Sequence, residues 1–260
     1  MSFKNLNIST KLPAIMLILA VLNAGIIGYV SLTSAQKSAE DLNKEKLSAI
    51  QDSVLSSLDT FFQTLSNDLI IQSQNELTKA AITELSAAFK AIPAADKTAY
   101  LQTKYIDENP NAAGKKQDLD KAPDGSDYSN IHAKYNDSFR TMVETNGYYD
   151  MFIFDADGNV VYTVFKERDY ATNMVDGKWK DTDLGLMFRA MKTTPVKNKL
   201  FYYDFRSYAP SNNVPATFIG VPVLDKDGKF MGGLAYQIPT ERINKSTVIN
   251  KKIGAEVAKS

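Results

Sequence analysis

The first apolar stretch of the chain is long enough to cross a membrane as a helix. Residues 12–36 contain no charged side chain, Lys4 and Lys11 precede them, and the next charged residue is Lys37. About 20 apolar residues span a bilayer, and basic residues before the span indicate a cytoplasmic N-terminus. We therefore predict a cytoplasmic segment over 1–11 and a transmembrane helix over 12–36, with a cleaved signal peptide as the alternative.

The apolar positions that follow repeat with the period of an amphipathic helix. Residues 37–92 contain neither glycine nor proline, and Pro93 ends the pattern. The apolar residues that recur at helical steps are Leu47, Ile50, Val54, Leu58, Phe61, Leu65 and Leu69. Leu55 and Phe62 widen this stripe. We predict one long stalk helix over 37–92, whose stripe covers a core, pairs with the same helix of a second chain, or does both.

After the stalk, helical and strand patterns alternate. Helical apolar spacing occurs at 129–144 and 184–192. Runs rich in β-branched and aromatic residues predict strands at 151–154, 160–165, 200–205, 216–224 and 230–238. Asp157-Gly158 lies between the first two of these runs and predicts a hairpin turn. This order of elements predicts an α+β module with an antiparallel sheet, which we place at 93–245.

Composition narrows the chemistry that the chain can perform. Thirty basic and 30 acidic residues leave no net charge, so nothing in the charge balance predicts binding to nucleic acid. The absence of cysteine excludes disulfides, thiolate metal ligands and cysteine nucleophiles. The one histidine, His132, argues against a histidine-based zinc site, and we expect it at the surface or partly packed. No catalytic or nucleotide-binding signature occurs, so we predict a protein that is not an enzyme and has no cofactor.

One acidic segment invites comparison with a calcium loop. The D-A-D-G-N run beginning at Asp155 would need glycine at its sixth position and glutamate at its twelfth to match an EF-hand. Those positions hold Val160 and Lys166. We therefore interpret the segment as a hairpin turn and predict no metal site there.

Two longer runs carry a resemblance to a known family. They are YYDMFIFDADGNVVYTVFKERDYATN and YAPSNNVPATFIGVPVLDKDGKFMGGLAYQIPTERIN, which contain two D-x-D-G hairpins and the ending G-x-L-A-x-Q-I-P followed by Arg242-Ile243-Asn244. Together, over 148–244, they resemble the Cache domain, the extracytoplasmic sensor module of bacterial methyl-accepting chemotaxis proteins. The resemblance implies a PAS-like fold, in which a long N-terminal helix lies beside a central antiparallel sheet with a ligand pocket over one face.

The same resemblance implies a place in the cell and a larger architecture. It implies a receptor of the bacterial inner membrane, single-pass in this chain, with its sensor module periplasmic or extracellular. Such receptors often continue with a second Cache module, a second transmembrane helix and a signalling coiled coil. We interpret 246–260 as the start of a truncated following segment.

We expect a ligand where the strand ends meet the polar segment that follows the hairpin. Tyrosine supplies a flat wall, aspartate binds an amine, and lysine or arginine binds a carboxylate. The candidate ligand-binding residues are Tyr149, Asp150, Tyr162, Lys166, Asp169, Arg189, Tyr202, Asp204 and Tyr208. Amino-acid-binding Cache modules resemble one another in an Arg-x-Trp-Tyr cluster, but here the helix reads LGLMFRAMK and lacks the Trp-Tyr pair. We therefore assign no amino-acid ligand.

Two classes of function stay open at this point. The first is the sensing portion of a chemoreceptor-type transducer that binds an unidentified small molecule and forms a homodimer through the long helix. The same module could serve a histidine kinase or a nucleotide cyclase. The second is a membrane-anchored dimerisation or protein-interaction module without a small ligand.

Overall fold

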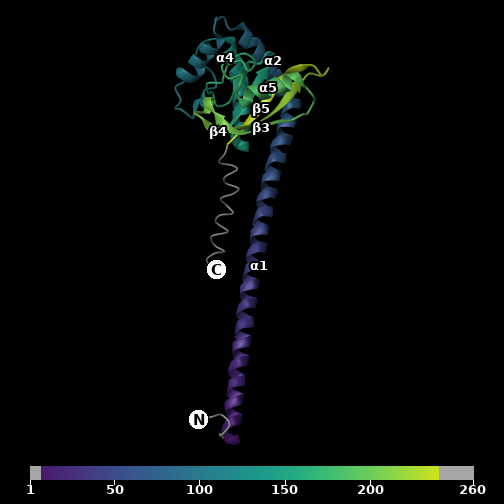
Figure 1. Ribbon diagram of the computed structural model, residues 1–260. Coiled ribbons are helices and arrows are strands. Elements are labelled where there is room, and N and C mark those ends of the chain that lie inside the picture. The colour runs from purple at the N-terminus through teal and green to yellow at the C-terminus, as the bar shows by residue number, and fades with distance from the viewer. Residues whose placement is uncertain (1–6, 240–260) are drawn as a thin grey trace. The chain divides into compact units, whose positions relative to one another are not determined.

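The computed structural model of the protein describes residues 7–239 (Figure 1). The chain divides into two units, Met1–Ser57 and Leu58–Ser260. The predicted segment 246–260 and the last three residues of the Cache-like ending, 242–244, lie outside the described residues.

The N-terminal unit is helical and apolar. Helix α1 (Ile8–Gln74) begins in this unit and continues into the second. An 18-residue window of α1 has a mean hydropathy of 2.3, and none of that window is buried against protein. Among the described residues, α1 is therefore the one helix long and apolar enough to cross a membrane.

The predicted single stalk helix is wrong in one respect, because two helices occupy 37–92. Helix α1 ends at Gln74 and α2 (Glu76–Ala91) follows. Asn75 between them has an extended backbone (φ −68°, ψ 131°), and its side chain accepts a hydrogen bond from the Leu77 N–H at 2.9 Å. Asparagine is a favoured N-cap, and this local break does not disturb the apolar period, which is why the pattern conceals it.

The second unit is built on a five-stranded sheet in which every pairing is antiparallel and the order is β2-β1-β5-β4-β3. Its strands are β1 (Asp150–Asp155), β2 (Val160–Thr163), β3 (Phe201–Tyr208), β4 (Val214–Leu224) and β5 (Phe230–Ile238). The predicted α+β class, with a long N-terminal helix and an antiparallel sheet, is confirmed.

Helices cover both faces of this sheet. The longer helices are α4 (Asp127–Asn146) and α5 (Asp183–Thr193), and the shorter ones are α3 (Lys97–Gln102), η2 (Thr103–Asp107), η3 (Lys116–Asp118) and η4 (Ala209–Ser211). Helices α2 and α4 pack on one face with Met151 and Ile153, and α5 packs on the other with Phe152 and Phe154. This alternation follows from the period of two in a strand.

The β1–β2 hairpin has the predicted turn. The Asp155 carboxylate accepts hydrogen bonds from the backbone N–H groups of Asp157, Gly158 and Asn159 at 2.9–3.0 Å. Gly158 has φ +102°, which favours glycine. The carboxylate of Asp155 is thus used to hold the turn.

Candidate functional site

The loop 164–172 that follows β2 carries two of the buried charged side chains of the second unit, Lys166 and Asp169. Strand β2 ends at Thr163, two residues earlier than predicted, and the Asp150 carboxylate accepts hydrogen bonds from the backbone that follows. Its Oδ1 accepts from the N–H groups of Met151 at 2.7 Å, Val164 at 2.8 Å and Phe165 at 3.0 Å. The chain turns away from the sheet at this point and begins the loop.

Three acidic side chains gather at the start of β1, and we call Asp150, Glu167 and Asp169 the acid cluster. Glu167 accepts hydrogen bonds from the Tyr149 hydroxyl at 2.8 Å and the Ser211 hydroxyl at 2.5 Å. Asp150 and Asp169 are fully buried, so the cluster places carboxylates where charge is costly.

A second set of contacts joins the acid cluster to the end of the sheet. The Tyr208 hydroxyl donates to Asp169 Oδ2 at 2.7 Å. Gln237 on β5 lies directly opposite Asp150 in the β1–β5 pairing, and its Nε2 donates to the Ser211 hydroxyl at 3.2 Å. The contacts around the acid cluster therefore come from β1, the loop, β3, η4 and β5.

Three acceptor atoms of this assembly have no hydrogen-bond partner within the described part of the chain. They are Asp150 Oδ2, Asp169 Oδ1 and Gln237 Oε1, and each is buried. Buried polar atoms are nearly always satisfied, and leaving one unpaired costs about 1–3 kcal/mol. Their concentration at one place therefore marks a site that lacks hydrogen-bond donors.

Burial and mutual repulsion change the acidity of the three carboxyl groups. Burial, and then the Asp169 charge, raise the pKa of Asp150 well above its usual range. Burial, and then the Glu167 charge, raise the pKa of Asp169 to about 7. Burial also raises the pKa of Glu167, against the hydrogen bonds that it accepts. The cluster favours a bound proton or a positively charged partner.

The side chain of Lys166 enters a separate, aromatic environment. Its ammonium lies over the rings of Tyr162 at 4.4 Å, Tyr170 at 5.3 Å and Tyr105 at 6.0 Å, which we call the tyrosine cage. It donates to the backbone oxygens of Thr163 and, at 3.5 Å, Val164. Burial lowers the pKa of Lys166 to about 7, although the Asp150 charge acts in the opposite direction.

His132 belongs to this aromatic environment and is fully buried, so the expectation of a surface or partly packed residue is wrong. Its ring lies 4.6 Å from that of Tyr105 and 5.3 Å from that of Tyr162. Its Nδ1 contacts the Asp120 carbonyl oxygen at 2.6 Å. Burial, and then the charge of Lys166, lower the pKa of His132 well below its usual value, which favours the neutral ring.

Six of the nine predicted ligand-binding residues come together around the loop: Tyr149, Asp150, Tyr162, Lys166, Asp169 and Tyr208. The structure does not bring the other three to the acid cluster. Arg189 donates to the carbonyl oxygens of Met174 and Lys180. Tyr202 is 56% exposed on the edge strand β3, and Asp204 is exposed on the same strand.

The prediction missed Ser211 and Gln237. The sequence contains an indication for Gln237, because it is the one amide side chain in the otherwise apolar and glycine-containing strand β5. It contains none for Ser211, because η4 reaches the cluster only through the tertiary fold.

Side chains from outside the loop hold it closed over the cluster. Gln102 on α3 donates to the carbonyl oxygens of Arg168 at 2.9 Å and Tyr170 at 2.8 Å. Trp179 Nε1 donates to the Arg168 carbonyl oxygen at 2.9 Å. Asp150 and Asp169 are fully buried in this arrangement.

Comparison with known proteins adds weak likenesses of fold. No family model matches the chain, and no curated protein matches it. The sensor domain of the histidine kinase DctB of V. cholerae is 13% identical over 71% of this chain and 60% of its own, with a TM-score of 0.35. An extracellular ligand-binding receptor of Desulfohalobium retbaense is 16% identical over 65% of this chain and 26% of its own, with a TM-score of 0.32.

The ligand-binding domain of the Campylobacter jejuni chemoreceptor Tlp3, in complex with L-norvaline, is 12% identical over 72% of this chain and 63% of its own, with a TM-score of 0.32. The chain thus spans less than two thirds of the length of each of these three structures. Similarity at this level carries no argument about ligand or activity.

Proposed function

We propose that the protein is a membrane-anchored sensory module whose acid cluster binds a small molecule through a protonated amine. The observation that carries the proposal is the set of three buried acceptors without donors, beside carboxyl groups of raised pKa. An ammonium group has three N–H donors and no acceptor. Its three donors equal the three acceptors in number, and its positive charge is opposite to that of a carboxylate.

The surroundings of the cluster support an amine over an amino acid. Lys166 and Arg189 donate to backbone carbonyl oxygens, so neither is arranged to pair with a ligand carboxylate. Aromatic walls lie nearby, since Tyr149 stacks on Phe165 at 4.8 Å. Aromatic faces favour cations, and pockets for small molecules combine such walls with a few polar groups.

Binding at this place would join parts of the fold that are far apart in sequence. An ammonium held by Asp150, Asp169 and Gln237 would connect β1, the loop and the last described strand. A ligand shifts a conformational equilibrium by its differential affinity for two states, and closure of the loop provides those two states. We propose that this closure is the sensed event.

The setting we propose is the bacterial inner membrane, with α1 as the anchor and the second unit periplasmic or extracellular. We propose further that the output is of the chemoreceptor type, with a histidine kinase or a nucleotide cyclase as alternatives. The homodimer through α1 is part of the same proposal.

One observation favours the second function, an interaction module. Leu47 is 66% exposed and Leu55 is 55% exposed on α1, so part of the predicted stripe is uncovered. Apolar residues at helical spacing pair readily with a second helix. Pairing through α1 is compatible with ligand binding at the acid cluster.

The full chain in lipid nanodiscs allows a direct test, because its single tryptophan contacts the loop. We would follow Trp179 fluorescence and thermal unfolding while adding ethanolamine, putrescine, choline, acetate and succinate. The primary amines should change the fluorescence and stabilise the protein, by about 2.7 kcal/mol at one hundred times Kd. Choline has the charge but no ammonium N–H, and it should bind much more weakly.

Matched variants connect the response to the cluster. Asp150→Asn and Asp169→Asn should abolish the amine response, whereas Asp176→Asn, at an exposed position nearby, should retain it. Binding of acetate or succinate but of no amine would refute the proposed ligand class. So would an amine response that survives in both cluster variants.

A further inference from the structure

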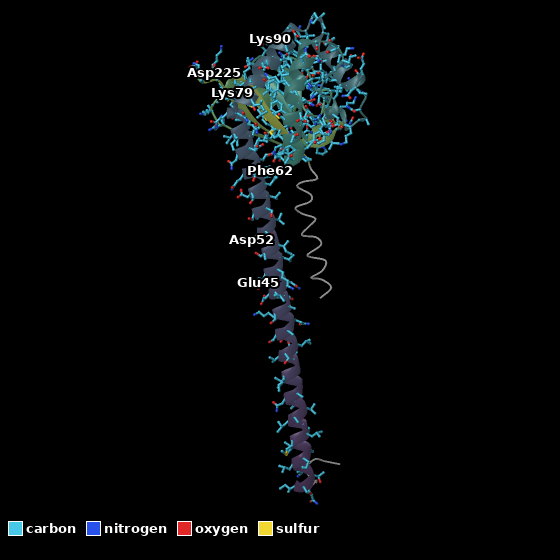
Figure 2. The ribbon with its side chains drawn as sticks, turned by 180° about the vertical axis from the view of Figure 1, so that it is seen from behind. Glu45, Asp52, Phe62, Lys79, Lys90 and Asp225 are labelled. Carbon is cyan, nitrogen blue, oxygen red and sulfur yellow. The ribbon has the colours of Figure 1, made fainter. Side chains whose placement is uncertain are left out.

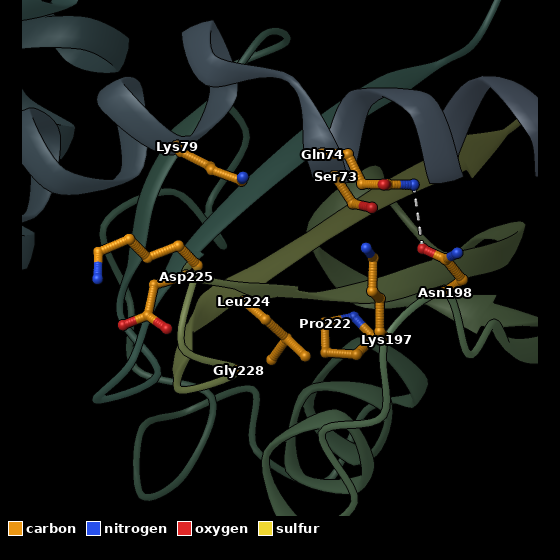
Figure 3. Close-up of a pocket in the computed structure, with 10 residues that line it drawn as sticks. Ser73, Gln74, Lys79, Lys197, Asn198, Pro222, Leu224, Asp225 and Gly228 are labelled. Atoms are coloured by element: carbon orange, nitrogen blue, oxygen red, sulfur yellow. Dashed lines mark hydrogen bonds between the residues drawn. The ribbon is translucent and has the colours of Figure 1, made fainter.

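A second candidate site lies at the break between α1 and α2. A cavity of about 280 Å³ opens there (Figure 3), with the last turn of α1 and the first turn of α2 on one side. The α5–β3 connection and the β4–β5 turn line the other side. It shares no residue with the acid cluster.

The lining of this junction pocket is basic. Lys79, Lys197 and Lys226 line it together with one acidic residue, Asp225. The Asp225 Oδ1 already accepts hydrogen bonds from the backbone N–H groups of Asp227 at 2.9 Å and Lys229 at 2.8 Å. Lys226 Nζ pairs with Asp227 Oδ2 at 2.9 Å. The positive charge that the pocket offers to a ligand therefore comes from Lys79 and Lys197.

Two of the lysines reach toward the same space. Figure 3 shows the side chains of Lys79 and Lys197 extending from opposite walls, one from α2 and the other from the α5–β3 connection. Lys79 Nζ lies 2.9 Å from Glu76 Oε1, but the side chain of Glu76 is 87% exposed. Exposed pairs of this kind contribute little, so the pair leaves Lys79 available to a ligand.

The rest of the pocket combines an apolar surface with fixed amides. Pro222 and Leu224 provide apolar lining on β4. Gln74 Nε2 donates to Asn198 Oδ1 at 3.2 Å, and this contact links the end of α1 to the α5–β3 connection. Binding sites for small organic molecules commonly join apolar walls to a few convergent polar groups.

We propose that the junction pocket binds a small organic anion, with its carboxylate or phosphate group between Lys79 and Lys197 and its apolar part against Pro222 and Leu224. The proposal goes beyond the amine site, since it assigns the opposite charge to a different place. A ligand there contacts both sides of the helix break at Asn75, through Ser73 and Gln74 on α1 and Lys79 on α2. Its effect is to fix the end of α1 against the β4–β5 turn.

The test uses the full chain in nanodiscs and measures thermal unfolding at constant ionic strength. The probes are acetate, butyrate, phenylacetate, phenyl phosphate and inorganic phosphate, with chloride as the reference and butylamine as the charge-reversed control. The organic anions should raise the unfolding temperature over chloride, and phenylacetate should exceed acetate. A response to phenyl phosphate and inorganic phosphate alone would assign the phosphate group in place of the carboxylate.

Variants decide whether the response belongs to this pocket. Lys79→Met and Lys197→Met should each weaken the apparent Kd about tenfold or more, as expected for the loss of one charged hydrogen bond. Lys121→Met, at an exposed position outside the pocket, should bind as the unmodified chain does. Asp169→Asn should also leave anion binding intact, which separates this proposal from the amine site.

The proposal is overturned by equal stabilisation in chloride and organic anions, by unchanged binding in both pocket variants, or by an equal loss in Lys121→Met. Urea midpoints of the ligand-free variants confirm that each protein is folded before binding is compared.

Discussion

Replacing Asp169 by asparagine tests the acid cluster without any ligand. Asp169 Oδ2 accepts from the Tyr208 hydroxyl at 2.7 Å, and its Oδ1 is one of the buried acceptors without a donor. Asparagine keeps an acceptor for Tyr208. It also replaces the other carboxylate oxygen by an N–H₂ group, which donates hydrogen bonds instead of accepting them. The substitution preserves shape and removes charge.

The expected magnitude follows from the pKa of Asp169, which burial, and then the Glu167 charge, raise from 3.8 to about 7. Between these values the folded protein holds a proton that the unfolded chain has lost. The free energy of unfolding therefore falls as the pH rises, by up to about 1.4 kcal/mol per pH unit. The whole effect is on the order of 4 kcal/mol, fully present below pH 4 and lost above pH 7.

Asp150 acts in the same direction, since its pKa is also raised. Part of that rise comes from the Asp169 charge, so Asp169→Asn should reduce the contribution of Asp150 as well. The variant should be more stable than the unmodified protein at about pH 8 and closest to it at about pH 4.

Urea unfolding followed by Trp179 fluorescence measures this difference, since Trp179 lies in the second unit beside the loop. The free energy of unfolding is determined at about pH 5, 6, 7 and 8, for the full chain in detergent micelles. The unmodified protein should lose stability across this range and Asp169→Asn should lose less. Asp176→Asn is the control and should follow the unmodified slope, because it removes an exposed charge.

Two outcomes would refute the reasoning. If Asp169→Asn and the unmodified protein have the same pH slope, Asp169 does not titrate in the folded state as burial requires. If Asp169→Asn is less stable at about pH 8, the Asp169 carboxylate accepts hydrogen bonds whose stabilisation exceeds the cost of burying its charge. The site would then not lack donors.

Three further substitutions, and one control for the second of them, test other parts of the fold. The pKa of Lys166 is lowered to about 7, so between pH 7 and 10.5 the folded protein holds fewer protons than the unfolded chain. The free energy of unfolding should therefore rise with pH over this range, and Lys166→Met should abolish that rise. Gly232→Ala should cost about 3 kcal/mol or more in urea unfolding, since a Cβ there would lie 2.0 Å from the Phe154 carbonyl oxygen at φ +155°. Gly114→Ala, with open space around it, should cost less. Asn75→Ala should cost about 1 kcal/mol by removing the N-cap of α2.

The strands of the sheet could be predicted because the residue patterns that specify them lie within short segments of the chain. The residues of β1 alternate between the two faces, with Met151 and Ile153 on one and Phe152 and Phe154 on the other. An Asp-Gly turn then reverses the chain. Neither feature depends on a distant segment, so the hairpin follows from the pattern. The pattern does not predict the register shift between Ile153 and Phe154 in the β1–β2 pairing.

The site could be predicted only in part, because its contacts are made between distant segments. The Tyr208 hydroxyl reaches Asp169 across 39 positions of the chain. Gln237 faces Asp150 because β5 pairs with β1, and no residue pattern specifies that strand order. Tyr202 and Asp204 were expected where the strand ends meet the polar segment, yet they lie on the edge strand β3, where polar side chains are ordinary.

Asp150 connects the acid cluster with Lys166 through the loop 164–172. The Asp150 carboxylate holds the Val164 and Phe165 N–H groups, and Lys166 holds the Thr163 and Val164 carbonyl oxygens, so opposite charges fix the two sides of one short turn. The Asp150 charge also raises the pKa of Lys166 against the effect of burial. An ammonium bound beside Asp150 would cancel that charge and make Lys166 easier to deprotonate. Coupling between two bound species is reciprocal. The proposed amine on the acid cluster and a proton on Lys166 would therefore oppose each other through the carboxylate that anchors the loop.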